Sequence, residues 1–130
     1  GLPEVARGLV AAGGGLMRLP QRVPYHLAME WALTGRLIEA EEAYRASLVT
    51  HLTNPGAALD KALEIATRIV ANGPMAVRAT KKIIVQSQDW TLEESFHRQR
   101  EISEPIRESD DAKEGAQAFT QKRPPVWQGK

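Results

Sequence analysis

Apolar residues at helical spacing run through most of this chain and are interrupted at short intervals by residues that begin or end helices. Leu59, Leu63 and Ala66 are examples, because they recur every three or four residues as the buried stripe of an amphipathic helix does. Asn72-Gly73 follows and is typical of a helix end, while Pro74 suits the first turn of the next helix. These helix-starting and helix-ending residues predict a mainly α chain built of short helices.

The same signals divide the segments on either side. Pro24 and Gly35 enclose one helical stripe, and the Ala- and Glu-rich residues 39–46 favour a second, short helix. Thr91 with Glu94 three residues later forms a capping box, so another helix is expected to begin near residue 92.

The last third of the chain contains three prolines that limit its helices. Pro105 is expected to kink or end the helix that follows the capping box, and Ser109 or Asp110 to cap a last helix that Pro124-Pro125 terminates. Residues 48–53 contain β-branched side chains and could form one short strand. We therefore predict about six helices and at most one or two short strands.

Charge and composition exclude several classes of function. Seventeen basic and sixteen acidic residues give a net charge of +1, so neither nucleic acid nor a membrane surface is expected as the main partner. No apolar run approaches the roughly 20 residues that span a bilayer. There is no cysteine, which removes disulfides and thiolate chemistry and is compatible with a cytoplasmic location.

The histidines do not form a metal-binding pattern. His26, His51 and His97 are far apart in sequence, and none has a second ligand at metal-binding spacing. No metal is expected, and the three are interpreted as surface or packing residues. No serine-centred nucleophile elbow or phosphate loop is present either.

Two features near the N-terminal end allow a structural and a chemical interpretation. Gly13-Gly14-Gly15 is either a flexible turn or a helix start whose backbone N–H groups hold an oxyanion. Glu4 lies between Leu2 and Val5, and is either an exposed terminal residue or a carboxylate held among apolar groups, suited to general acid or base chemistry.

Three collinear segments resemble the enoyl-CoA hydratase (crotonase) superfamily. Residues 1–15 resemble the stretch in which a core strand of that family leads into a glycine-rich helix start, and residues 28–49 resemble its next helical hairpin. Residues 111–127 resemble its C-terminal helix and tail. Each motif is loose, but the ordered set covers essentially the whole chain.

The resemblance implies a fold and a domain plan. The chain would be the C-terminal helical part of the α/β crotonase (ClpP-like) fold. Residues 1–23 would end the crotonase core with a strand end and the glycine-rich helix start, and residues 24–90 would form a helical region. Residues 91–130 would form the C-terminal helical region that covers coenzyme A and makes trimer contacts.

The resemblance also implies roles for particular residues. In this family two glutamates flank the C=C bond of a 2-enoyl-CoA thioester and share the water that adds across it. Glu4 matches the second glutamate, which delivers a proton to the α-carbon. The backbone at Ala12 and Gly13 matches the helix start beside the reacting carbon. Phe119 and Lys122 match positions that reach the CoA portion, often across a trimer interface; a lysine suits its phosphates.

Other parts of the family pattern are absent or changed. The first glutamate belongs to a Gly-Gly-x-Glu segment that precedes these residues in the family, and the two oxyanion-hole amides also come from preceding segments. Ser47 replaces a usual glycine and would be strained if left-handed geometry is kept, and Ala11 replaces a frequent proline. Leu16, Met17 and Trp90 would either shape an acyl pocket or belong to a core.

Two hypotheses of different classes follow. The first is an enoyl-CoA hydratase-like lyase of fatty-acid breakdown of which this chain holds part of the active site, with isomerase and dehydratase activities of the superfamily left open. The second is a helical assembly module without catalysis. No cofactor is expected beyond the coenzyme A of an acyl-CoA substrate. Helices without their core would expose an apolar face, so a homo-oligomer is expected, a trimer or hexamer in the parent enzyme.

Overall fold

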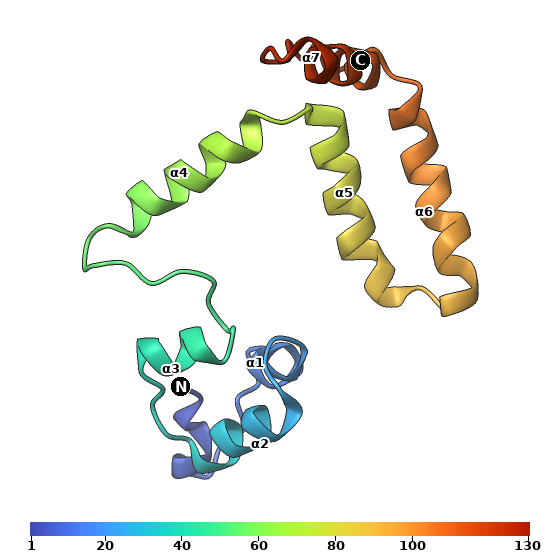
Figure 1. Cartoon of the computed structure of the whole chain (residues 1–130). Coiled ribbons are helices and arrows are strands. Elements are labelled where there is room, and N and C mark those ends of the chain that lie inside the picture. Colours follow the sequence, from blue (N-terminus) through green and yellow to red (C-terminus); the bar gives the residue numbers. More distant parts are fainter. The chain divides into compact units, whose positions relative to one another are not determined.

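The computed structural model describes all 130 residues as helices joined by turns and irregular segments (Figure 1). It contains seven α-helices, three short 3-10 helices and no strand, which confirms the prediction of a mainly α chain. The chain divides into two compact units, residues 1–59 and residues 60–130. No helix is long and apolar enough to cross a membrane. The division falls within the predicted helical region 24–90, and the core, helical and trimer-contact assignments stay predictions.

The first unit contains five short helical elements around a small core. They are η1 (Pro3–Arg7), α1 (Gly15–Arg18), η2 (Leu19–Gln21), α2 (Tyr25–Thr34) and α3 (Ala40–Arg45). Val23, Ala28 and Trp31 form the buried cluster, and Leu19 and Ile38 are among the half-buried residues that pack against it. Trp31 is the largest fully buried side chain, at 1% exposure. One aromatic residue on α2 therefore organises the unit.

Ion pairs of Arg36 with Glu30 and Glu42, together with a hydrogen bond from Trp31, fix the connection between α2 and α3. The Trp31 indole N–H donates to Glu42 Oε1 at 3.2 Å, and Arg36 donates to Glu42 at 2.5 Å and to Glu30 at 2.9 Å. The Arg36 guanidinium also lies 5.9 Å from the centre of the Trp31 ring. Its hydrogen bond to Glu42 holds the pKa of that carboxyl below its usual range. The network fixes the turn that follows Gly35.

Gly35 ends α2, as predicted, and also allows a close approach. Its φ of +63° is left-handed, and a Cβ placed there would lie 2.9 Å from Val5 Cγ2 and 3.4 Å from the Cα of Pro3. The first of these contacts is shorter than Cβ atoms make in proteins, so a side chain here would require Val5 or η1 to shift. The glycine thus lets η1 pack against the end of α2.

The predicted strand at residues 48–53 is wrong. These residues form bends and irregular backbone after α3, because Ser47 adopts the left-handed φ of 61° and turns the chain. A strand needs a neighbouring strand to satisfy its N–H and C=O groups, and the chain offers none. β-branched residues alone do not supply that partner.

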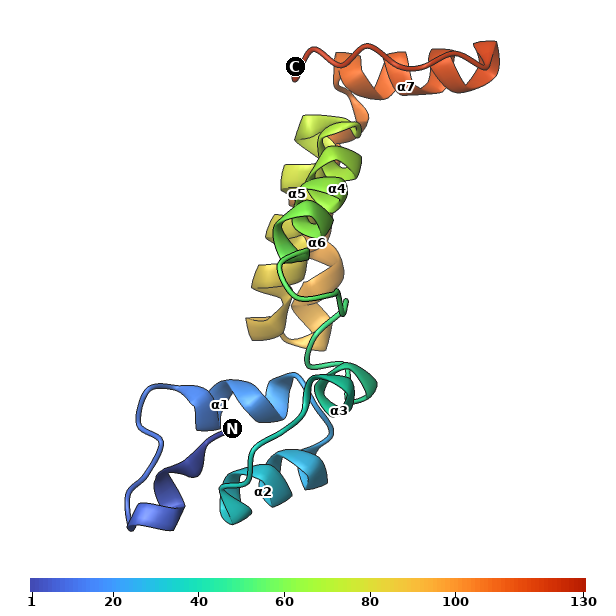
Figure 2. The ribbon, with the colours of Figure 1, turned by 90° about the vertical axis from the view of Figure 1, so that its left-hand side faces the viewer.

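The second unit contains the longer helices. They are α4 (Ala58–Val70), whose first two residues precede the division, α5 (Pro74–Gln86), η3 (Ser87–Asp89), α6 (Leu92–Arg107) and α7 (Asp110–Gln121). α5 and α6 contact each other as an antiparallel pair, and α7 runs across one end of that pair (Figures 1 and 2).

Local chemistry at the helix ends agrees with the sequence signals. Pro74 occupies the first turn of α5, Thr91 and Glu94 form the reciprocal capping box of α6, and the Ser109 hydroxyl accepts from the Ala112 N–H at 3.1 Å to cap α7. Pro105 lies inside α6, which ends two residues later at Arg107. The proline therefore precedes the helix end by less than one turn.

The C-terminal tail returns along α7 and is tied down at three points. The carboxylate of Asp111, only 5% exposed, accepts from the backbone N–H groups of Gln128 at 2.7 Å and Gly129 at 3.0 Å. Glu114 accepts from Arg123 at 2.6 Å and from the Val126 N–H at 2.8 Å. The Trp127 indole donates to the Ala71 carbonyl at 2.8 Å. The tail thus joins α7 to the α4–α5 connection.

Candidate active site

Glu4 lies on η1, whose backbone is well defined. Pro3 provides the first residue of this 3-10 helix and fixes its own φ. The Glu4 carbonyl accepts from the Leu9 N–H at 3.0 Å, and the Arg7 guanidinium donates to the Pro3 carbonyl at 3.1 Å. Arg7, the nearest cation in sequence, is therefore engaged with the backbone of the helix.

The Glu4 side chain carries the most unusual polar atom in the chain. Its Oε2 is buried and has no hydrogen-bond partner. A buried acceptor without a partner costs about 1–3 kcal/mol, so native structures contain few of them. Glu4 as a whole is half-buried rather than exposed, and its catalytic role stays a prediction.

Ala12 and Gly13 lie in the turn directly before α1. Their backbone N–H groups donate no hydrogen bond within the chain. A close contact holds the start of α1 against the segment that bears Glu4, since a Cβ on Gly15 would lie 2.8 Å from Leu2 Cδ2. The carboxylate and the two free amides therefore belong to the same unit, on segments that touch.

Phe119 and Lys122 lie at the C-terminal end of α7. The Phe119 ring is 87% exposed, and the Lys122 ammonium is exposed and makes no bond within the chain. Lys122 adopts the left-handed φ of 52° as the cap of α7. An exposed ring and an unpaired cation three residues apart at one helix end can contact a ligand that is both apolar and anionic.

The predicted site residues are divided between the two units. Glu4, Ala12 and Gly13 belong to residues 1–59, and Phe119 and Lys122 to residues 60–130. The roles assigned to all five stay predictions. Leu16 and Met17 are exposed at 38% and 69% within these 130 residues, and Trp90 is half-buried, so the choice between an acyl pocket and a core stays open for them.

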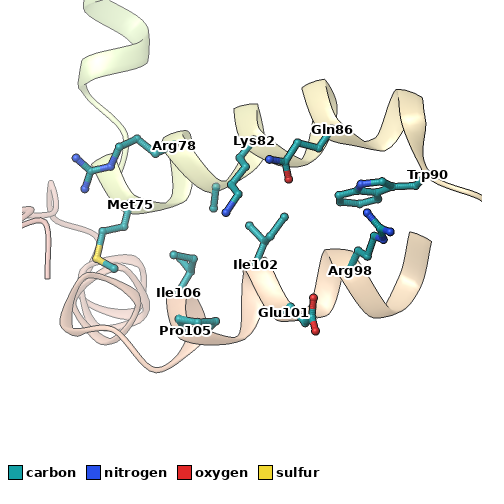
Figure 3. Close-up of a pocket in the computed structure, with 11 residues that line it drawn as sticks. Met75, Arg78, Lys82, Gln86, Trp90, Arg98, Glu101, Ile102, Pro105 and Ile106 are labelled. Carbon is teal, nitrogen blue, oxygen red and sulfur yellow. The ribbon is translucent and has the colours of Figure 1, made fainter. Parts of the chain in front are cut away.

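Sequence reasoning missed a groove between α5 and α6. Figure 3 shows Trp90 at one end of it, Met75 at the other, and Lys82 opposite Ile102 between them. Its volume is about 590 Å³. The signal that could have revealed it is the spacing of Arg78 and Lys82, which lie four residues apart and hence one above the other on a helix.

The histidines and acidic residues form no metal site. No group of three or more His, Asp or Glu side chains lies close enough together to hold an ion. All three histidines are exposed: His26 packs edge-on against Tyr25, and His97 lies 3.2 Å from Glu101.

Known proteins share both the sequence and the fold. The enoyl-CoA hydratase/isomerase family model matches residues 1–130. Enoyl-CoA hydratase EchA19 of Mycobacterium tuberculosis is 42% identical over 130 residues, which are all of this chain and 49% of that protein. A carnitinyl-CoA dehydratase of Citrobacter koseri is 37% identical over 133 residues, covering 99% of this chain and 51% of the dehydratase.

Solved structures give the same picture. The crystal structure of enoyl-CoA hydratase EchA1 from Mycobacterium marinum matches all of this chain and 52% of its own, with a TM-score of 0.93 and 57% identity. An enoyl-CoA hydratase from Mycobacterium tuberculosis matches with a TM-score of 0.93 and 54% identity, over 100% of this chain and 52% of that one. The chain spans about half the length of the relatives that it matches.

Proposed function

Because the chain belongs to the enoyl-CoA hydratase/isomerase family, we propose that it supplies one half of the active site of an enoyl-CoA hydratase-like lyase. The reaction is the addition of water across the 2,3 double bond of an acyl-CoA thioester. The observation that carries the proposal is the buried Oε2 of Glu4, a carboxylate oxygen without a partner. Fatty-acid breakdown in the cytoplasm is the proposed setting.

Glu4 would act as the acid of the hydration. The water oxygen bonds to C3, the electron pair of the double bond moves toward the thioester carbonyl, and C2 takes a proton from the Glu4 carboxyl group. The proton that the water loses restores the pair of glutamates to its starting state. An acid whose oxygen is not already hydrogen-bonded can present its proton to carbon without breaking a bond first.

The remaining groups would come from residues outside these 130. They are the glutamate that activates the water and two backbone amides that stabilise the thioester enolate. Each such amide contributes on the order of 10²–10³-fold to the rate. The free amides at Ala12 and Gly13 would line the reacting carbon from this side of the site.

The exposed end of α7 would contact the CoA portion of the substrate. Lys122 has an unpaired ammonium for phosphate oxygens, and the open Phe119 ring offers an apolar contact. Coenzyme A enters this proposal as part of the substrate, and no further cofactor is required.

Dehydration is the strongest alternative reaction. The matching carnitinyl-CoA dehydratases suggest it, and it is the same chemistry in the reverse direction, with Glu4 accepting the α-proton. An isomerase would use a glutamate at this position as well. A helical assembly module without catalysis is the alternative for the 130 residues by themselves.

The test joins this chain to the first half of the Mycobacterium marinum hydratase and follows the loss of enone absorbance of crotonyl-CoA. We expect turnover by the chimera and none by the 130 residues alone. Glu4→Gln in the chimera should lower kcat by about 10²–10⁴-fold, the usual contribution of a general acid.

Glu93→Gln is the matched control. Glu93 is an exposed glutamate that makes no bond within the chain, so its replacement should leave kcat within about twofold. If the 130 residues alone hydrated crotonyl-CoA and Glu4→Gln abolished that activity, the proposal that they supply only half of the active site would be contradicted. A chimera in which Glu4→Gln and Glu93→Gln behave alike would remove Glu4 from the mechanism.

A further inference from the structure

The turn between α2 and α3 holds one cation between two carboxylates. Arg36 Nε donates to Glu30 Oε1 of α2 at 2.9 Å, and its Nη1 donates to Glu42 Oε2 of α3 at 2.8 Å. Its Nη2 donates to Glu42 Oε1 at 2.5 Å. Three nitrogens of one planar guanidinium thus join two helices, an arrangement that the single ammonium of a lysine does not reproduce. We call these three residues the Arg36 network.

The Arg36 network is anchored on the core of the first unit. The Trp31 indole N–H donates to Glu42 Oε1 at 3.2 Å, and the Arg36 guanidinium lies 5.9 Å from the centre of the Trp31 ring. Trp31 itself is 1% exposed. The Arg36 and Glu42 side chains are 35% and 37% exposed, and ion pairs at this exposure add little to stability. The network is therefore better suited to fixing the geometry of the turn than to stabilising the unit.

The turn that the network holds lies against both residues that flank Glu4. A Cβ on Gly35 would lie 2.9 Å from Val5 Cγ2 and 3.4 Å from the Cα of Pro3. Because Gly35 has no side chain, η1 rests there on backbone, which cannot adjust by a change of rotamer. A shift of this turn would therefore shift η1.

The Glu4 side chain has no bond of its own that holds it in place. Its Oε2 is buried without a hydrogen-bond partner, and no hydrogen bond or ion pair within the chain reaches the other oxygen. The direction of this carboxylate is therefore set by packing and by the backbone of η1. A group that delivers a proton must be held within about 0.5 Å of its productive place, and a misplacement of about 1 Å can cost on the order of 10²-fold in rate.

We propose that Arg36 and Glu42 are positioning residues for Glu4, acting through the Gly35 turn on which η1 rests. The proposal rests on the proposed function, because the position of Glu4 matters to the reaction only if Glu4 takes part in it. Neither Arg36 nor Glu42 needs to touch the substrate for this effect.

The test uses the chimera with the first half of the Mycobacterium marinum hydratase and crotonyl-CoA as substrate. Arg36→Gln and Glu42→Gln should each lower kcat about tenfold, as a shift of Glu4 by less than 1 Å would, and leave KM within about twofold. The double variant should lose no more than either single variant, because all three break the same link. Arg36→Lys keeps the charge and should lose less than Arg36→Gln.

Glu41→Gln is the matched control. Glu41 precedes Glu42 on α3, is exposed, and its side chain makes no bond within the chain, so kcat should stay within about twofold. Hydrogen exchange of the Leu9 N–H, which donates to the Glu4 carbonyl at 3.0 Å, is the second readout and uses the 130-residue chain. This exchange should accelerate in Arg36→Gln and Glu42→Gln and not in Glu41→Gln, while the circular dichroism of all three stays unchanged.

Several results would overturn the proposal. They are an unchanged kcat in Arg36→Gln and Glu42→Gln, an equal loss in Glu41→Gln, and losses that add up in the double variant. A fall in kcat that comes with lost helicity or with a matching rise in KM would also overturn it, because a merely structural role gives that result.

The exchange at Leu9 separates this proposal from the hydratase assignment. Hydration that Glu4→Gln abolishes and Arg36→Gln leaves unchanged would overturn the positioning alone. A chimera without hydration would overturn the proposed function. Exchange at Leu9 would then still decide whether the Arg36 network holds η1, since faster exchange in Arg36→Gln supports that link and unchanged exchange overturns it.

Discussion

Gly35 is the residue on which the position of Glu4 depends most directly. It is left-handed, and the atoms nearest to its missing Cβ belong to Val5, Pro3 and Leu2, which surround Glu4 in sequence. A side chain at this position would therefore strain its own backbone and also push η1 away from α2. The ion-pair network of Arg36 would resist any compensating movement of the turn.

Gly35→Ala is expected to destabilise the first unit and to loosen η1. The left-handed backbone costs an alanine about 1–2 kcal/mol, and overpacking against Val5 adds about 1–3 kcal/mol. Urea denaturation measures the total loss in the free energy of unfolding. Hydrogen exchange of the Leu9 N–H reports on η1, because this N–H donates to the Glu4 carbonyl.

Gly56→Ala is the control that measures the cost of the left-handed backbone by itself. Gly56 has a φ of +85° in the same unit, but nothing lies within 4 Å of its missing Cβ. This variant should show the backbone cost and unchanged exchange of the Leu9 N–H. Equal destabilisation by the two variants would mean that contact with η1 does not matter.

At the scale of elements, the ends of helices were predictable and the contacts between helices were not. Pro74, the Thr91–Glu94 box and Ser109 act within three or four residues of themselves, so their effect can be read from the sequence. The bond from Trp127 to Ala71 joins residues 56 positions apart, and no local pattern predicts it.

The same limit applied to the candidate site. The sequence marked Glu4 and the glycine-rich turn, but no local pattern predicts that one oxygen of the Glu4 carboxylate is buried without a partner. The error at residues 48–53 has the same origin, because a strand depends on a distant partner that the sequence does not identify.

The hydrogen bonds from Arg123 and the Val126 N–H to Glu114, which hold the C-terminal tail against α7, should break in acid. Arg123 and the Val126 N–H hydrogen-bond to Glu114 and lower the pKa of its carboxyl from 4.5 to about 2. A carboxyl whose pKa is lower in the folded state stabilises that state fully above its unfolded pKa, and loses this contribution as the pH falls from about 4.5 to about 2. Hydrogen exchange of the Val126 N–H should accelerate relative to a neighbouring exposed amide over this interval.

Glu114→Gln should leave the Val126 N–H poorly protected at every pH in that interval. Glu104→Gln is the matched control, since Glu104 is exposed on α6 and makes no bond within the chain. Its pH dependence at Val126 should equal that of the unchanged protein. Protection of Val126 that stays constant from pH 5 to pH 2 would show that Glu114 does not hold the tail.

The whole molecule leaves more surface uncovered than a compact protein does. It exposes 10,296 Å². A compact protein of this mass exposes about 6,800 Å², and two separate compact domains of half the mass about 8,200 Å² together. The excess therefore does not depend on how the two units are placed. Its clearest source is α4, where Leu59, Leu63 and Val70 form an apolar stripe that is 56–75% exposed.

An amphipathic helix with an open apolar stripe requires a cover, so the 130 residues alone should associate with further copies. Light scattering at micromolar concentration should give a mass above that of one chain. Leu63→Glu should return it to the mass of one chain, because a carboxylate in a covered apolar stripe is strongly disfavoured. Arg68→Glu adds the same carboxylate on the opposite side of α4 at 3.6 residues per turn, and should leave the mass unchanged. A single-chain mass before any substitution, or equal effects of the two substitutions, would show that this stripe needs no second copy.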